Sequence, residues 1–151
     1  MMKQWSLLLL RISLGWLLVI WGINKVVNVE HGLAVANKFY FGLIAFDNLL
    51  QAGGVLQMVV GLLIVAGLMR RLVYPIQLLL SAATLLAVWQ SVIDPWSWIF
   101  TGSNALFYPS LIIFAGCLVV MAWRDEDHFA LDSLRKKPPP QPQATNPTTQ
   151  A

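Results

Sequence analysis

Apolar residues in this chain are gathered into four long runs that are separated by short polar segments. The runs are Trp5–Ile23, Leu49–Met69, Leu72–Ile93 and Ala105–Trp123. At a rise of about 1.5 Å per residue, a helix of about 20 residues crosses a hydrocarbon layer of about 30 Å. None of the runs alternates apolar and polar positions as a strand would, so helices are expected to satisfy the backbone there. The pattern predicts an all-α integral membrane protein built as a four-helix bundle.

Composition supports the same class. The chain of 151 residues is 58% hydrophobic and 11% charged, whereas a soluble domain carries about 25% charged residues. This length suits one bundle without a second domain. The net charge of +3 is small and its basic residues are dispersed at the ends of the runs, which excludes a nucleic-acid surface. The single cysteine excludes an internal disulfide and a Cys-x-x-Cys pair.

The basic residues predict an orientation. If the four runs alternate across the membrane, seven basic residues lie on one side and two on the other. The seven are Lys3, Arg70, Arg71, Arg124, Arg135, Lys136 and Lys137, and the two are Lys25 and Lys38. Cytoplasmic loops carry the excess of Lys and Arg, so both termini are expected in the cytoplasm. The first run has no small-x-small cleavage site, and we interpret it as a retained helix.

The segments outside the runs complete the domain organisation. Residues 24–48 are too polar to cross the bilayer and too apolar to remain in water, which predicts a short interfacial helix in the first external loop. Residues 1–137 are expected to form the transmembrane domain. Residues 138–151 are rich in Pro, Gln and Thr and are predicted to be a disordered cytoplasmic tail.

Arg11 is the sharpest candidate for function, because it lies within the first run. An arginine inside a membrane span is a functional candidate by default. The competing interpretation is that its side chain extends back to lipid phosphates or makes a purely structural contact. No Asp or Glu lies in any of the four runs. The partners that we consider are a bound ligand or groups of the chain itself: Gln77, helix carbonyls, the acidic run Asp125–Asp127 and Asp132.

Helical spacing brings further polar residues onto shared faces. Gln77, Ser81 and Thr84 are spaced i, i+4, i+7 in the third run. Gln77 is expected at the depth of Arg11, so a polar pocket between the helices is one hypothesis, with Gln57 as a further donor to a carbonyl-bearing ligand. The alternative is that the Ser and Thr hydroxyls bond to carbonyls of their own helix, or join helices weakly.

Glycines mark the faces along which helices approach closely. Gly15 and Gly22 follow Arg11 on one stripe that continues to Lys25, and Gly54 and Gly61 are also seven residues apart. We interpret all four as helix-packing positions. Cys117 is interpreted as a structural buried cysteine. With two histidines, predicted on opposite sides of the membrane, no metal site is expected.

Three segments resemble the DoxX family of membrane proteins. Residues 8–28, LLLRISLGWLLVIWGINKVVN, are similar to its first-helix signature, in which Arg11 precedes Gly15 by four and Gly22-x-x-Lys25 closes the helix. Residues 54–71, GVLQMVVGLLIVAGLMRR, resemble its glycine-rich helix with a basic end. The exit FALDSL, residues 129–134, matches the aromatic-x-Leu-Asp ending at Asp132. One departure is that Phe107–Ser110 replaces an acid that is frequent near the start of the fourth helix.

The resemblance implies a four-helix protein of the inner (plasma) membrane of bacteria or archaea. It also implies work linked to quinones and redox enzymes. On this hypothesis the chain is a membrane subunit or partner of a quinone-linked redox system, and Arg11 and Gln77 anchor a quinone carbonyl. With no cysteine pair, the redox groups would come from a partner or a bound cofactor.

Two alternatives remain beside the redox subunit. One is a non-catalytic scaffold or assembly factor whose glycine-rich faces dock partner proteins. The other is a stand-alone thiol oxidoreductase of the four-helix vitamin K epoxide reductase type, against which the single Cys117 argues. The lipid bilayer is the expected surrounding, and partners that we consider are redox-enzyme subunits and further copies of this chain.

Overall fold

The computed structural model describes residues 1–39 and 47–135, and within them it confirms the all-helical prediction. The elements in chain order are α1 (Met2–Val27), α2 (Val29–Phe39), α3 (Asp47–Ala66), α4 (Arg70–Ala87), α5 (Trp89–Ile93), η1 (Ala105–Phe107), α6 (Pro109–Ala122), η2 (Arg124–Glu126) and α7 (Leu131–Arg135). The predicted disordered tail, 138–151, lies outside the described residues.

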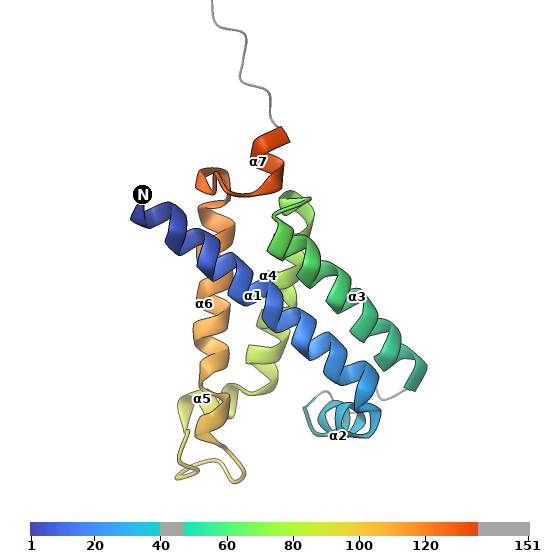
Figure 1. The fold of residues 1–151 in the computed structure, drawn as a ribbon. Helices are drawn as coiled ribbons and strands as arrows, with labels where there is room; N and C mark the ends of the chain where they lie inside the picture. Colours follow the sequence, from blue (N-terminus) through green and yellow to red (C-terminus); the bar gives the residue numbers. More distant parts are fainter. Residues whose placement is uncertain (40–46, 136–151) are drawn as a thin grey trace, which may run out of the picture.

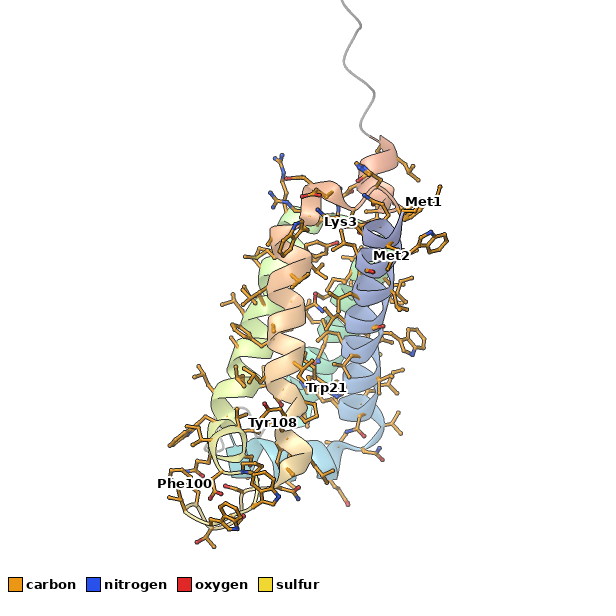
Figure 2. The ribbon with its side chains drawn as sticks, turned by 90° about the vertical axis from the view of Figure 1, so that its left-hand side faces the viewer. Met1, Met2, Lys3, Trp21, Phe100 and Tyr108 are labelled. Atoms are coloured by element: carbon orange, nitrogen blue, oxygen red, sulfur yellow. The ribbon has the colours of Figure 1, made fainter. Side chains whose placement is uncertain are left out.

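The long helices α1, α3, α4 and α6 run alternately up and down beside one another (Figure 1). The N-terminus and α7 lie at one end of the bundle, which we call the Arg11 end. Helices α2 and α5 lie at the other end, which we call the Lys25 end (Figure 1). Figure 2 shows the same division, with Met1 and Lys3 at the first end and Phe100 at the second.

Three helices of the described chain are long and apolar enough to cross a membrane. They are α1, α3 and the segment Ala105–Ala122, which joins η1 and α6. Helix α4 is not among them, because Arg70, Arg71 and Gln77 lower the hydropathy of its 18 residues. The membrane class is therefore supported by length and composition, while a fourth crossing stays a prediction.

The helix bounds differ from the apolar runs at particular residues. The third run, 72–93, is divided at Val88, whose backbone (φ −109°, ψ 17°) departs from the helix and separates α4 from α5. The Thr84 hydroxyl bonds to the Leu80 carbonyl at 3.0 Å just before this break, and such bonds within a helix often bend it. Helix α3 ends before Gly67, because the chain turns there with a φ of +70°.

Helix α2 occupies part of the loop in which an interfacial helix was predicted. It lies across the Lys25 end of the bundle (Figure 1). Its Gly32 is buried, and a Cβ there would meet Leu50 of α3 at 2.6 Å. The rest of that loop, 40–46, lies outside the described residues.

Helices α1 and α3 make the closest contact in the bundle, and four glycines form it. A Cβ on Gly15 would lie 2.8 Å from the Gly61 carbonyl oxygen, and one on Gly61 would lie 2.6 Å from that of Gly15. Gly22 and Gly54 repeat this reciprocal contact at 2.6 and 2.9 Å. The equal spacing of seven residues in both helices therefore lets two antiparallel backbones touch at two levels.

The core lies where the four long helices meet. Its buried members are Leu14, Leu18, Val60, Ile64, Val73, Tyr74, Cys117 and Val120. Large apolar side chains also cover the outside of the bundle, including Leu9, Trp16, Leu56, Leu79, Leu86 and Ile112. A surface of this kind is stable in contact with lipid and would promote aggregation in water.

Candidate functional site

Arg11 lies fully inside the bundle, with 2% of its surface exposed. Its Nη1 donates to the Val65 carbonyl at 2.9 Å and to the Ile64 carbonyl at 3.4 Å, where α3 ends. Its Nη2 donates to the Phe129 carbonyl at 3.3 Å. The Val65 carbonyl can accept because the last turn of a helix leaves its C=O groups without partners in the helix, and the Ile64 carbonyl also accepts the Gly67 N–H at 3.0 Å. The guanidinium therefore fastens α1 to the end of α3 and to the C-terminal segment, residues 124–135.

Asp127 neutralises this buried charge. Its Oδ2 lies 2.9 Å from Arg11 Nε, and both side chains are almost fully buried. The contact is an ion pair rather than an aligned hydrogen bond, and neither carboxylate oxygen accepts a hydrogen bond from the described residues. The acidic run that the sequence analysis considered as a partner thus supplies the counter-ion through its last member, while Gln77 is not among the partners of Arg11.

Gly67 makes room for the arginine. A Cβ at this position would overlap Arg11 Nη1 and would lie 2.6 Å from the Cβ of Ala130, which is itself fully buried. The φ of +70° favours glycine independently of that crowding. The Gly67 carbonyl accepts the backbone N–H of Asp132 at 3.1 Å, so the same turn holds the C-terminal segment.

A second buried arginine, Arg70, extends the network. Its Nη1 donates to the carbonyls of Arg124 and Asp127, and its Nη2 donates to Ser133 Oγ at 2.8 Å. Asp132 Oδ2 accepts the backbone N–H of Arg70 at 3.0 Å, which satisfies a donor at the beginning of α4. Two arginines and two aspartates thus join α1, the end of α3 and the beginning of α4 to the C-terminal segment.

Tyr74 is the member that the sequence analysis missed. It is 2% exposed, and its hydroxyl has no hydrogen-bond partner among the described residues. The phenol interacts electrostatically with Arg11 and Asp127 and lies one turn before Gln77 on α4. A tyrosine in an apolar run carries no signal of its own, and its position relative to Asp127 depends on contacts far apart in the sequence.

Among the described residues, none of the other predicted polar side chains bonds to Arg11. Gln57 is buried and accepts from Lys25 Nζ at 2.6 Å, toward the Lys25 end. Ser81 donates to the Leu78 carbonyl at 3.0 Å and Thr84 to the Leu80 carbonyl, so both follow the alternative of bonding within their own helix. Gln77 is buried at 3% exposure on the same helix. The predicted polar pocket around Arg11 and Gln77 therefore stays a prediction, while Gln57, Ser81 and Thr84 have partners within the chain.

An open cleft of about 280 Å³ borders the charged network at the Arg11 end. Its lining residues come from the turn after α3, the beginning of α4, and the C-terminal segment: Met69, Arg70, Arg71, Arg124, Asp125 and Asp132. Among the described residues no group of three His, Cys, Asp or Glu side chains could hold a metal ion. The polar chemistry available in this cleft is that of guanidinium and carboxylate groups.

At the Lys25 end, Asp94 organises the loop before α6. Its Oδ1 accepts from the Trp98 N–H at 3.0 Å, and its Oδ2 accepts from Ile99 and Phe100 at 2.6 and 2.8 Å. Desolvation raises the pKa of Asp94, but these backbone donors outweigh it and hold the pKa below its ordinary value. The carboxylate therefore works as a structural acceptor.

A scan of protein-family models and searches of the curated proteins and of the solved structures find no match to this chain. The DoxX resemblance, the quinone and the redox partner accordingly stay predictions.

Proposed function

We propose that this chain is a four-helix inner-membrane protein, with both termini cytoplasmic, that serves as a membrane subunit or partner of a quinone-linked redox system. The observation that carries the proposal is the convergence of the three segments that resemble DoxX. Arg11, the turn with Gly67 and Arg70, and Asp132 come from those segments, and they meet in one buried network. Three segments that resemble the same family and also meet at one site are expected to act as one functional unit.

Chain direction supports four crossings. Helices α3 and α6 run from the Lys25 end to the Arg11 end (Figure 1). If both cross the membrane, the chain between them has to return across it, and α4 with α5 is the segment available. The contacts of Lys3 with Glu126 and of Arg70 with Arg124 bring three basic residues together at the Arg11 end. Because cytoplasmic segments carry the excess of Lys and Arg, this favours a cytoplasmic Arg11 end. Reporter fusions at residue 151 should report a cytoplasmic C-terminus.

A quinone carbonyl would need hydrogen-bond donors that are not already used. Arg11 donates from Nη1 and Nη2 to carbonyls of the chain, and its Nε faces Asp127 in the ion pair. Gln57 is likewise engaged by Lys25. The Tyr74 hydroxyl, buried without a partner, and Gln77 one turn later are better candidates for a carbonyl than Arg11. This moves the quinone hypothesis from α1 to one face of α4.

The scaffold alternative has less support. Gly15, Gly22, Gly54 and Gly61 face one another within the α1–α3 contact, so a partner helix cannot use them. A scaffold would have to dock its partners through the outer apolar surface or the charged end.

The test is to purify the protein from its native membrane in mild detergent and to measure the bound quinone and any co-purifying redox subunit. We expect quinone near one per protein in the parent and a loss of about tenfold in Tyr74→Phe, because one hydrogen bond of about 1.4 kcal/mol is removed. Tyr108→Phe is the matched control, since Tyr108 lies at the other end of the bundle (Figure 2) and is 44% exposed. A parent that carries neither quinone nor a redox-active partner would refute the proposal.

A further inference from the structure

The cleft at the Arg11 end carries an excess of positive charge. Three of its lining residues are arginines and two are aspartates. Asp125 lies 3.6 Å from Arg124, and Asp132 is engaged by the backbone N–H and the side chain of Arg70. Arg71 is exposed and has no ion pair within the described part of the chain. Among residues 1–39 and 47–135, Arg71 is thus an unpaired cation that lines the cleft together with Arg70 and Arg124, and each of those two arginines has an aspartate partner.

Two residues that line this cleft each have a buried Nε without an acceptor in the described chain. Arg70 is 4% exposed, and its Nε has no hydrogen-bond partner among the described residues, because Asp132 Oδ2 is 3.8 Å away. The Nε of Arg124 is buried and unpartnered as well. Both Nη groups of Arg70 are already engaged, so the donor pair that can match the oxygens of a phosphate is that of the exposed Arg71 guanidinium. Donors beyond those that the chain satisfies favour a ligand with several acceptor oxygens.

The apolar rim of the cleft distinguishes a lipid from a soluble anion. Met69 lines the cleft with 54% of its surface exposed, and Leu72 on the next turn is also 54% exposed. These side chains continue toward the outer apolar surface of α4, where lipid chains would lie. A free phosphate gains nothing from such a rim, whereas the acyl chains of a phospholipid would cover it.

We propose that the cleft formed by Arg70, Arg71 and Arg124 binds the phosphate headgroup of an anionic phospholipid. Basic pockets at the cytoplasmic ends of membrane helices recognise such headgroups through charge and hydrogen bonds. The bound lipid joins the α3–α4 turn to the C-terminal segment, since both contribute to the lining. Lipid composition would thereby influence how firmly this segment covers Arg11. The site is independent of any redox function.

The experiment measures thermal unfolding of the full chain in neutral detergent during titration with phosphatidylglycerol. We expect the midpoint to rise for the parent and to stay level with phosphatidylcholine or with inorganic phosphate. Arg71→Gln should need about fivefold more phosphatidylglycerol for the same rise, as removal of one cation near a headgroup predicts. Arg71→Lys, which keeps the charge and loses the paired donors, should fall between the two.

Arg135→Gln is the matched control, because Arg135 is exposed on α7 and does not line the cleft. It should titrate as the parent does. Equal titration of Arg71→Gln and the parent would overturn the proposal, and so would an equal response to phosphatidylcholine. A rise of the same size with inorganic phosphate alone would replace the lipid with a soluble anion and would equally overturn it.

Discussion

The first helix buries a cation against α3 at each end of the bundle, and the two ends treat that cation differently. Arg11 meets a carboxylate and several backbone carbonyls, whereas Lys25, on the same stripe of α1, meets the neutral amide oxygen of Gln57 at 2.6 Å. Arg11 is 2% exposed, while Lys25 is half-buried. The cation that is removed completely from solvent is therefore the one with a charged partner.

Side-chain chemistry explains the difference. A guanidinium presents five N–H donors in a fixed plane, so several acceptors must be brought to it, and here they come from α3 and from the C-terminal segment. A lysine on a flexible stem can keep its ammonium near the interface and requires fewer acceptors. The comparison indicates that residues 124–135 supply the counter-ion and a carbonyl to the cation on α1, and it predicts variants of unequal effect.

The largest effect is expected for Asp127→Asn. This change leaves Arg11 buried without a counter-ion, and breaking a buried pair destabilises a protein by about 3–5 kcal/mol. The measurement is the free energy of unfolding in detergent. Asp125→Asn is the control, because that side chain is 68% exposed and a surface pair contributes about 0–1 kcal/mol. Equal effects of the two variants would mean that Asp127 does not neutralise Arg11.

The next largest loss of stability is expected from substitutions in the glycine contact between α1 and α3, and it should be similar toward the Arg11 end and toward the Lys25 end. Gly61→Ala and Gly54→Ala each place a Cβ within 3 Å of the α1 backbone, at Gly15 and Gly22 respectively. We expect each to destabilise the bundle by about 1–3 kcal/mol through overpacking. Gly53→Ala is the control, because nothing lies within 4 Å of its Cβ position. It should gain up to about 1 kcal/mol from helix propensity.

A smaller effect is expected for Gln57→Leu, which removes the acceptor of Lys25. We expect a loss of about 1 kcal/mol, below the usual value for a hydrogen bond to a charged group because Lys25 is half-buried. Gln57→Glu would give Lys25 a carboxylate partner and should restore or raise stability at neutral pH. Gln51→Leu on the exposed side of α3 is the control. No loss in Gln57→Leu would show that Lys25 is satisfied by water.

The smallest and most local effect concerns Asp94. Its pKa in the folded chain is below the ordinary 3.8, so its stabilising contribution is present above that pH and is lost as the pH falls through the lower folded value. The protection factors of the Trp98, Ile99 and Phe100 amides, which compare their exchange with that of an unfolded chain at the same pH, should fall as the pH drops through that lower folded value. Asp94→Asn should exchange fast at every pH. A parent loop that stays protected in acid would contradict the role of this carboxylate.

Much of the architecture could be predicted from the sequence, because it depends on local periodicity. Runs of about twenty apolar residues predicted the long helices, three of which are long and apolar enough to cross a membrane. The spacing of Gly15 with Gly22 and of Gly54 with Gly61 indicated close packing, and the structure brings both pairs into one contact. The acidic run was among the partners considered for Arg11 because few other acids are available to this chain.

The tertiary structure alone decided which groups meet. Which acid neutralises Arg11, and which donors stay unpartnered, depend on a fold that brings residue 127 back to residue 11. Tyr74 and the arginine cleft arise from the same return of the chain. Local patterns set the helices because backbone hydrogen bonds join near neighbours. Pairing of buried charges depends instead on long-range packing, which no pattern within a single run encodes.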